Sequence, residues 1–230
     1  MSRRRDSSRK ANNPFKRKVD TRKTRDSFLI VCEGEKTEPN YFRKFHGPID
    51  VKVEGTGCNT ISLVKKAVEI RDEKQEEGEV YDHVWCVFDK DSFSDDNFNQ
   101  PKKLAENNNI RPAYSNEAFE LWYLFHFGYH QAATSRNDYG TMLSKKLNFS
   151  YRKNDPGIYE VLATMQAHAI RNAENLIKSY DPHNPAKDNP CTTCSPFGPG
   201  ITQIWARIQE LNATHQCRRV ILNKFHHHRK

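Results

Sequence analysis

Two short apolar segments, each followed by acidic residues, restrict most strongly how this chain folds. Residues 28–32 read Phe-Leu-Ile-Val-Cys and lead into the turn Glu-Gly-Glu-Lys-Thr-Glu at 33–38. Residues 84–88 read Val-Trp-Cys-Val-Phe and lead into Asp-Lys-Asp at 89–91. Continuous apolar runs of this length with β-branched members are typical of strands buried on both faces. We therefore expect two buried strands whose carboxyl ends carry acids.

The first half of the chain alternates between strand-like and helix-like segments. The strand-like segments are 28–32, 51–54, 83–88 and 111–114. Helix-like segments follow at 39–46, at about 60–75, where Asn59 or Thr60 is the expected cap, and after a polar loop at 92–100. This alternation predicts an α/β fold with a mostly parallel sheet flanked by helices. Such sheets bind ligands beyond the carboxyl ends of their strands, where both acidic groups lie.

The second half of the chain has a mainly helical pattern. Helices are expected at 116–127, 139–147, 157–178 and 201–211, with a Pro/Asn/Cys/Gly-rich loop at 181–200. Ser115 or Asn116 is the expected cap of the first of these helices, with Glu117 in its first turn. We divide the chain into a basic tail (1–26), an α/β core (27–115), a helical extension that completes the domain (116–215) and a basic, His-rich tail (216–230).

The positive charge is concentrated at the N-terminus. Of the 37 Lys and Arg residues, eleven lie in residues 1–26, together with only three Asp, whereas basic and acidic residues balance in the rest of the chain. Such a segment, poor in large apolar residues, is expected to be disordered and to bind nucleic-acid phosphates without sequence preference. The candidate contacts are Arg3, Arg4, Arg5, Lys16, Arg17 and Lys18. A solubilising leader or a contact for an acidic partner is the alternative interpretation.

The acids at the two strand ends have the chemistry of a cation site. Asp89 and Asp91 are two residues apart, so in an extended chain their side chains point to the same side. Two such carboxylates repel one another unless a cation or a proton lies between them, and an oxygen-only site suits Mg²⁺ or Mn²⁺. Glu33 would supply a third oxygen or act as a general base. The alternative is that these are ordinary turn acids.

The segment Gly34-Glu35-Lys36-Thr37 superficially resembles a phosphate-binding P-loop. The P-loop pattern requires Gly-x4-Gly-Lys-Ser/Thr, but Glu35 replaces the second glycine and residue 30 is isoleucine. We therefore reject nucleotide binding of this kind and keep Lys36 only as a candidate contact for a single phosphate.

Three further residues are candidates for catalysis. Glu120 lies among apolar residues of the expected helix at 116–127, where an unpaired carboxylate is costly to bury, so it either reaches the cation or forms an ion pair. His126, at the end of that helix, is a candidate proton shuttle or a hydrogen-bonded core residue. Lys153, before Pro156-Gly157, is a candidate to hold a scissile phosphate or an ordinary surface residue.

The cysteines favour a reducing compartment. Six cysteines are scattered along the chain, two of them within the apolar strands, and there is neither an apolar signal core nor an apolar run long enough to span a membrane. We expect a cytoplasmic protein. Cys191 and Cys194 have the spacing of half a zinc knuckle, but His215 and Cys217 lie too close together for the usual second half. Structural zinc is therefore disfavoured.

Several segments together resemble one protein family. They are residues 28–39, Val-Phe-Asp-Lys-Asp at 87–91, the aromatic segment 115–127, Tyr-Arg-Lys-Asn-Asp-Pro at 151–156 and Asn189-Pro190 with the threonines after it. In this order, over about residues 27–212, they resemble the RloB/AbiLii family of prokaryotic defence-associated proteins, although Cys191 departs from the family's usual Asn-Pro-Ser-Thr. The resemblance implies a Toprim-like fold, with Glu33 as acid/base residue and Asp89 and Asp91 as metal ligands.

The resemblance also implies a partner ATPase of the AAA or ABC type and a role in abortive infection or phage defence. The leading hypothesis is a Mg²⁺- or Mn²⁺-dependent nuclease that cuts RNA, tRNA or DNA. The alternative is a non-catalytic sensor or adaptor that binds nucleic acid or the ATPase. Self-association into a homo-oligomer is left open.

Overall fold

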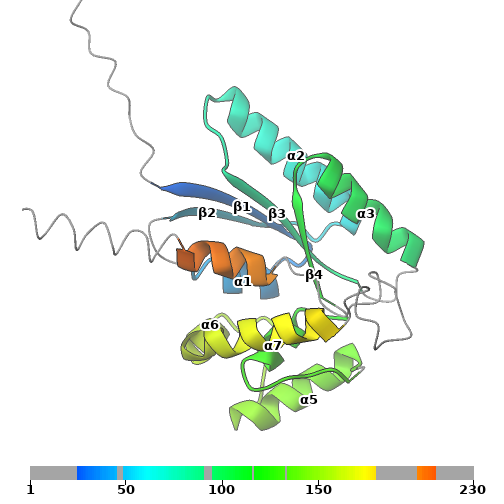
Figure 1. The fold of residues 1–230 in the computed structure, drawn as a ribbon, viewed down its shortest axis with the longest axis vertical. Helices are drawn as coiled ribbons and strands as arrows, with labels where there is room; N and C mark the ends of the chain where they lie inside the picture. Colours follow the sequence, from blue (N-terminus) through cyan, green and yellow to red (C-terminus); the bar gives the residue numbers. More distant parts are fainter. Residues whose placement is uncertain are drawn as a thin grey trace, which may run out of the picture.

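A four-stranded parallel sheet forms the centre of the protein (Figure 1). The computed structural model describes residues 25–45, 49–90, 95–115, 117–132, 134–179 and 201–210. The strands are β1 (Asp26–Cys32), β2 (Ile49–Gly55), β3 (His83–Asp89) and β4 (Arg111–Ser115), and their order in the sheet is β2-β1-β3-β4 with every pair parallel. The expected Toprim-like α/β class, with a helical C-terminal half, is confirmed.

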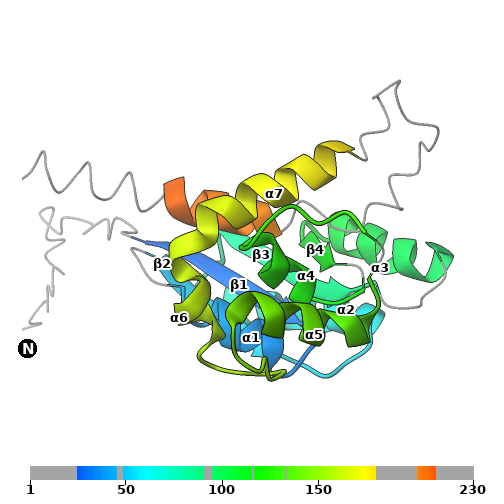
Figure 2. The same cartoon turned by 90° about the horizontal axis from the view of Figure 1, so that it is seen from below.

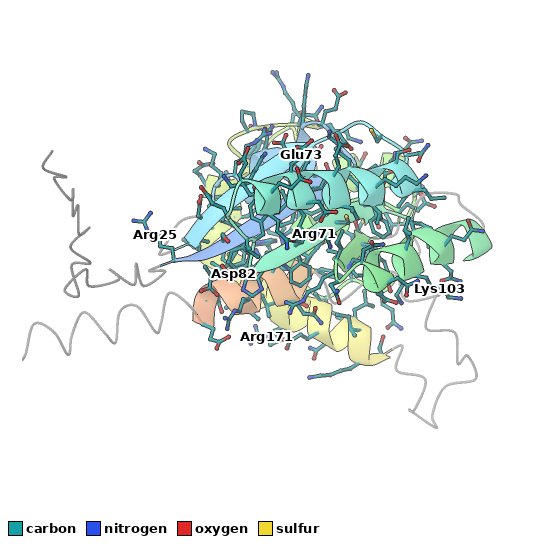
Figure 3. All side chains as sticks on the ribbon, turned by 90° about the horizontal axis from the view of Figure 1, so that it is seen from above. Arg25, Arg71, Glu73, Asp82, Lys103 and Arg171 are labelled. Atoms are coloured by element: carbon teal, nitrogen blue, oxygen red, sulfur yellow. The ribbon has the colours of Figure 1, made fainter. Side chains whose placement is uncertain are left out.

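Both faces of the sheet are covered, which explains why β1 and β3 are apolar throughout. Phe28 and Ile30 pack into the apolar cluster on one face, and Leu29 and Val31 into the cluster on the other. Helices α2 (Thr60–Glu76) and α3 (Asp95–Asn107) lie together on one side of the sheet, the side seen in Figure 3. The remaining helices lie on the opposite side (Figures 1 and 2).

The second helical layer contains most of the C-terminal half. Its members are α1 (Thr37–Phe42), α4 (Glu120–Phe125), α5 (Arg136–Leu147), α6 (Ile158–Leu162), a 3-10 turn (Ala163–Met165), α7 (Gln166–Ser179) and the helix at 201–210. Tyr41 joins three of them, because its buried hydroxyl is hydrogen-bonded to Gln166 at 2.7 Å and accepts a bond from Trp205 Nε1 at 3.2 Å. These bonds therefore tie α1, α7 and the helix at 201–210 together on this side of the sheet.

The register of β1 and β3 brings the two acidic strand ends together. Cys32 pairs with Val87, and the Glu33 N–H donates to the Val87 carbonyl oxygen at 2.8 Å, one residue beyond the strand. Gly55 ends the neighbouring strand β2, and a Cβ atom there would lie 2.8 Å from the carbonyl oxygens of Gly34 and Glu35. A residue without a side chain therefore lets the acidic turn pack closely over the edge of the sheet.

Several expected helix limits were wrong. Helix α4 begins at Glu120, not at 116, because Ser115 is the last residue of β4 and 3-10-type hydrogen bonds from Leu121 to Ala118 and from Trp122 to Phe119 form the entry turn. Ser115 therefore does not cap the helix, and Asn116 lies outside the described residues. Asn59 is confirmed as the cap of α2, since its Oδ1 accepts the Ser62 N–H at 3.0 Å.

Two other limits also differ. Helix α3 begins at Asp95, within the expected polar loop, and continues through Pro101; α5 begins three residues early, at Arg136. The single helix expected at 157–178 is divided by the 3-10 turn into α6 and α7.

Some expectations concern parts of the chain outside the described residues. The basic residues Arg3, Arg4, Arg5, Lys16, Arg17 and Lys18 are among them, as are Cys191 and Cys194 and the tail at 216–230. Among the residues that the structure does describe, none of the helices has the length and apolar character needed to cross a membrane.

Candidate active site

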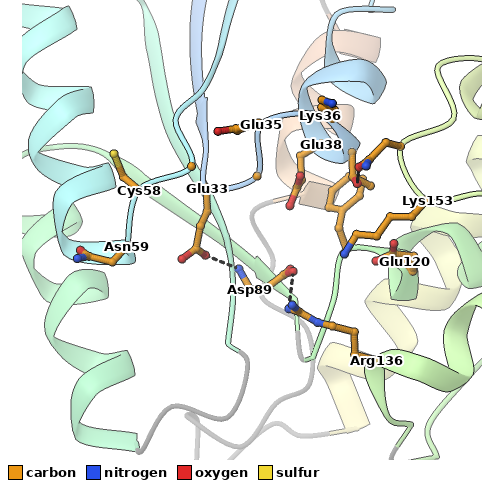
Figure 4. A pocket seen from close by; sticks show the side chains of 15 residues that line it. Glu33, Glu35, Lys36, Glu38, Cys58, Asn59, Asp89, Glu120, Arg136 and Lys153 are labelled. Atoms are coloured by element: carbon orange, nitrogen blue, oxygen red, sulfur yellow. Dashed lines mark hydrogen bonds and ion pairs between the residues drawn. The ribbon is translucent and has the colours of Figure 1, made fainter.

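A polar pocket of about 570 Å³ opens at the carboxyl end of the sheet (Figure 4). Its lining comes from the ends of β1 and β3, the loop before α2, the starts of α1, α4 and α5, and the turn at 153–154. Five acidic and three basic residues line it: Glu33, Glu35, Glu38, Asp89 and Glu120, with Lys36, Arg136 and Lys153. The pocket therefore lies where the parallel-sheet argument placed a ligand site.

Glu33 is held in place from two sides. One carboxylate oxygen accepts the backbone N–H of Asp89 at 3.1 Å, and the other accepts the hydroxyl of Thr60 at 3.3 Å. Thr60 is the first residue of α2, so the helix fixes the acid that β1 delivers. These two hydrogen bonds fix the position of Glu33 beside Asp89.

Asp89 faces both a hydroxyl and a guanidinium group. Its Oδ1 accepts the Ser115 hydroxyl at 2.9 Å, and its Oδ2 lies 3.3 Å from Arg136. Burial raises the pKa of Asp89 well above its usual range, the charge of Glu38 raises it further, and the Ser115 hydrogen bond and Arg136 oppose these effects. Asp89 is thus an acid whose ionised form needs positive charge nearby.

Glu38 is a site residue that the sequence analysis did not single out. It lies in the first turn of α1, only 5% of it is exposed, and it points toward Asp89 (Figure 4). Burial, with the charges of Glu120 and Glu33, raises the pKa of Glu38 to about 7. A side chain at Gly34 would overlap this carboxylate. The available signal was its spacing, five residues after Glu33 in the same acidic turn.

Glu120 lines the pocket. It is buried at the start of α4, and one of its carboxylate oxygens accepts the Tyr151 hydroxyl at 3.2 Å. Burial, with the charge of Glu120 and this hydrogen bond, raises the pKa of Tyr151. Tyr151 lies two residues before Lys153, so this contact joins two sides of the pocket.

Lys153 extends into the pocket from a turn that is attached to α1 (Figure 4). The next residue, Asn154, has a φ of 67° and accepts the Thr37 hydroxyl on Oδ1 at 2.6 Å. Its carbonyl oxygen accepts the Asn40 side-chain amide at 3.2 Å. We call these two bonds the Asn154 latch. Lys36, at the N-cap of α1, is the second lysine at the pocket.

His126 does not lie in this pocket. Its ring is buried against Trp122 at the end of α4, and its Nδ1 is hydrogen-bonded to the Trp122 carbonyl oxygen at 2.9 Å. Burial lowers the pKa of His126 to about 4. The ring is therefore a neutral core group near pH 7, which fits the hydrogen-bonded core interpretation rather than the proton shuttle.

The donor chemistry of the pocket suits a hard divalent cation, since carboxylate oxygens are the preferred ligands of Mg²⁺ and Mn²⁺. Asp91, the third expected ligand, lies outside the described residues. Within the described residues, no three His, Cys, Asp or Glu side chains are already grouped as a metal site. Both Asp89 oxygens have partners, so a cation at Asp89 would share or displace Arg136.

The chain is thus an α/β protein with an acidic pocket at the carboxyl end of a parallel sheet. The family model of RloB-like proteins matches residues 28–197, which is most of the chain, so the chain belongs to the RloB-like family. This membership is consistent with a defence-related protein. Neither a curated protein nor a solved structure gives a significant match to the chain.

Proposed function

We propose that this protein is a Mg²⁺- or Mn²⁺-dependent phosphodiesterase, a nuclease that acts as the effector of a phage-defence system. The observation that supports this most strongly is the meeting of Glu33 and Asp89, 56 residues apart in the chain, through a hydrogen bond at one pocket. Acids alone would repel a phosphodiester. Lys36, Arg136 and Lys153 supply the positive charge that a phosphate needs beside them.

Each residue has a role in this proposal. A cation, when bound, would withdraw charge from the phosphate oxygens, and Asp89 and Asp91 would hold it. Glu33 would accept the proton of the attacking water or hydroxyl, while Lys153 would stabilise the charge that develops on the phosphate. Glu38, whose pKa is about 7, is a second candidate for proton transfer, because a group that titrates near the working pH both accepts and releases protons.

The biological part of the proposal rests on the family alone. Membership of the RloB-like family supports a role in defence, and the resemblance of the sequence motifs to that family supports a partner ATPase and activation in response to infection. The geometry of the pocket is neutral on whether RNA, tRNA or DNA is the substrate.

One observation favours the second candidate function, a non-catalytic sensor or adaptor. Arg136 and Ser115 together contact both Asp89 oxygens. A protein without a bound metal would need such contacts to stabilise this buried carboxylate. Such a protein would use the pocket rim to bind nucleic acid or the ATPase without cutting.

The deciding experiment compares cleavage by the full chain and its variants. Purified protein is incubated with tRNA, single-stranded RNA and plasmid DNA, with Mg²⁺ or Mn²⁺ and with EDTA. We expect cleavage that EDTA abolishes and that Asp89→Asn and Glu33→Gln each reduce about 100-fold or more. Asp50→Asn is the matched control, because Asp50 is an exposed acid near the start of β2, away from the pocket.

Cleavage that persists in Asp89→Asn would contradict the proposal. If the wild-type chain alone cuts nothing, it is co-expressed with the candidate ATPase and toxicity is scored. Toxicity that requires both the ATPase and Asp89 would support the nuclease. Equal toxicity of wild type and Asp89→Asn would favour the sensor or adaptor.

A further inference from the structure

Arg136 is the cation most directly engaged with an acid of the pocket. It is the first residue of α5, and its Nη2 lies 3.3 Å from Asp89 Oδ2 (Figure 4). The same nitrogen donates to the Glu117 carbonyl oxygen at 3.1 Å, and the Arg136 backbone N–H donates to the Glu117 carboxylate at 3.0 Å. The start of α5 is thus fixed beside the end of β4, while the side chain reaches across to β3.

The pocket explains why a guanidinium group lies there. Asp89 is close enough to Glu38 and Glu120 for both charges to disfavour its ionised form, and its own side chain is only 16% exposed. A buried carboxylate among other carboxylates needs a counter-charge. In a protein without a bound cation, Arg136 provides that charge.

The same contact conflicts with a metal ion. A divalent cation at Asp89 would bind the oxygens that Ser115 and Arg136 now contact, and two cations on one carboxylate repel each other. Arg136 is able to leave the pair, because its own side chain is 42% exposed and water solvates the released guanidinium, while the incoming cation replaces it as the counter-charge of the more buried Asp89. Its planar fork of donors matches a phosphate group as well as it matches a carboxylate.

We propose that Arg136 is an exchangeable counter-ion: it pairs with Asp89 in the metal-free protein, yields that carboxylate to the incoming cation, and then binds a phosphate of the nucleic acid. This rests on the proposed metal-dependent function and assigns a residue that neither the sequence motifs nor the family match singles out. Under this proposal the metal ion binds Asp89 and the phosphate binds Arg136, so the binding of either ligand frees the residue that the other ligand needs. Each ligand should therefore strengthen the binding of the other.

A purely structural role for Arg136 predicts different results. If the residue only anchors α5 beside Glu117, its removal should loosen the pocket and weaken metal binding. If it competes with the metal for Asp89, its removal should strengthen metal binding. The sign of the change therefore separates the two roles.

The first measurement is a Mn²⁺ titration of the full chain, with free Mn²⁺ followed by electron paramagnetic resonance. Arg136→Gln should bind Mn²⁺ about threefold or more tightly than wild type, as expected when no guanidinium competes with the cation for Asp89. Arg136→Lys keeps the charge and should lie between the two. Lys145→Ala, an exposed cation in the last turn of the same helix, is the control and should leave the affinity unchanged.

The second measurement is the binding of a fluorescein-labelled single-stranded oligonucleotide, in EDTA and in Ca²⁺, with a gel to verify that it stays intact. Ca²⁺ should strengthen binding to the wild-type chain, and Arg136→Gln should show at most about half of that increase because the released guanidinium is missing. Thermal unfolding of each variant establishes that it is folded.

The outcomes separate this inference from the function on which it rests. Mn²⁺ binding that Asp89→Asn abolishes, but that Arg136→Gln leaves unchanged or weakens, overturns the exchange while the metal site stands. A wild-type chain that binds no Mn²⁺ overturns both. An equal strengthening by Ca²⁺ in wild type and Arg136→Gln overturns the transfer of Arg136 to phosphate.

Discussion

Glu38 makes the free energy of unfolding depend on pH. Its pKa is about 7 in the folded protein, against 4.5 for an unperturbed glutamate, chiefly because of burial. Well below pH 4.5 the residue is protonated in both states and changes nothing. Between pH 4.5 and 7 the unfolded chain ionises first, so the free energy of unfolding falls, by at most about 3 kcal/mol at pH 8.

Glu38→Gln removes this pH-dependent penalty, since glutamine does not ionise. We expect the variant to exceed wild type in unfolding free energy by about 1–3 kcal/mol at pH 8 and to match it at pH 4. The measurement is urea denaturation at both pH values in EDTA. Glu35→Gln, which removes an exposed acid from the same turn, is the control and should change little at either pH. A pH-independent effect of Glu38→Gln would show that Glu38 is not the titrating group.

At the residue scale, the sequence was sufficient to predict the positions of site residues that follow directly after adjacent strands. Glu33 and Asp89 follow apolar runs that read as buried strands, and carboxyl ends of parallel strands share one edge. Glu38 and Arg136 were not predictable in this way. Their positions depend on how α1 and α5 pack over that edge, and no spacing along the chain encodes a contact between residues 89 and 136.

At the element scale, the Asn154 latch is expected to position Lys153. Asn154→Ala would remove the Thr37 hydrogen bond and place an alanine at a φ of 67°, where a Cβ is strained, so the unfolding free energy should fall by about 1–3 kcal/mol. Phosphodiesterase activity should fall further than this instability explains, because Lys153 loses its fixed position.

The matched control for this prediction is Asn148→Ala. Asn148 also has a left-handed φ, of 59°, but it caps the C-terminus of α5 and does not line the pocket. Its substitution should lower the stability measured by urea denaturation and leave kcat of the proposed phosphodiesterase reaction intact in the folded protein. An equal decrease of kcat in the two variants would assign the latch a purely structural role.

Element identity was more predictable than element limits. Each described strand and helix core follows from periodicity, because burial on one or both faces dictates where apolar residues recur. The start of α4 was missed because Ser-Asn-Glu at 115–117 has the pattern of a helix cap and first turn, whereas Ser115 in fact completes β4. Local composition does not show whether residues between a strand and a helix belong to the strand or to the helix.

At the scale of the whole molecule, the basic N-terminal segment is expected to supply affinity without specificity. Deleting residues 1–24 removes most of its positive charge and leaves Asp26, which pairs with Arg207 at 3.1 Å. We expect weaker oligonucleotide binding and a flatter dependence on salt, by roughly 0.7–0.9 in the logarithmic slope for each phosphate that the shortened chain no longer neutralises. Fluorescence anisotropy between low and moderate salt measures both. An unchanged slope would assign the segment another role.

The central claim is that the ends of β1 and β3 together hold a hard divalent cation. Anomalous diffraction from crystals of the full chain soaked in Mn²⁺ tests it most directly. We predict an anomalous peak in the pocket within coordination distance of Asp89 and Glu33, and its disappearance in Asp89→Asn. Well-diffracting Mn²⁺-soaked crystals with no peak in this pocket, or with the peak bound elsewhere, would contradict the claim.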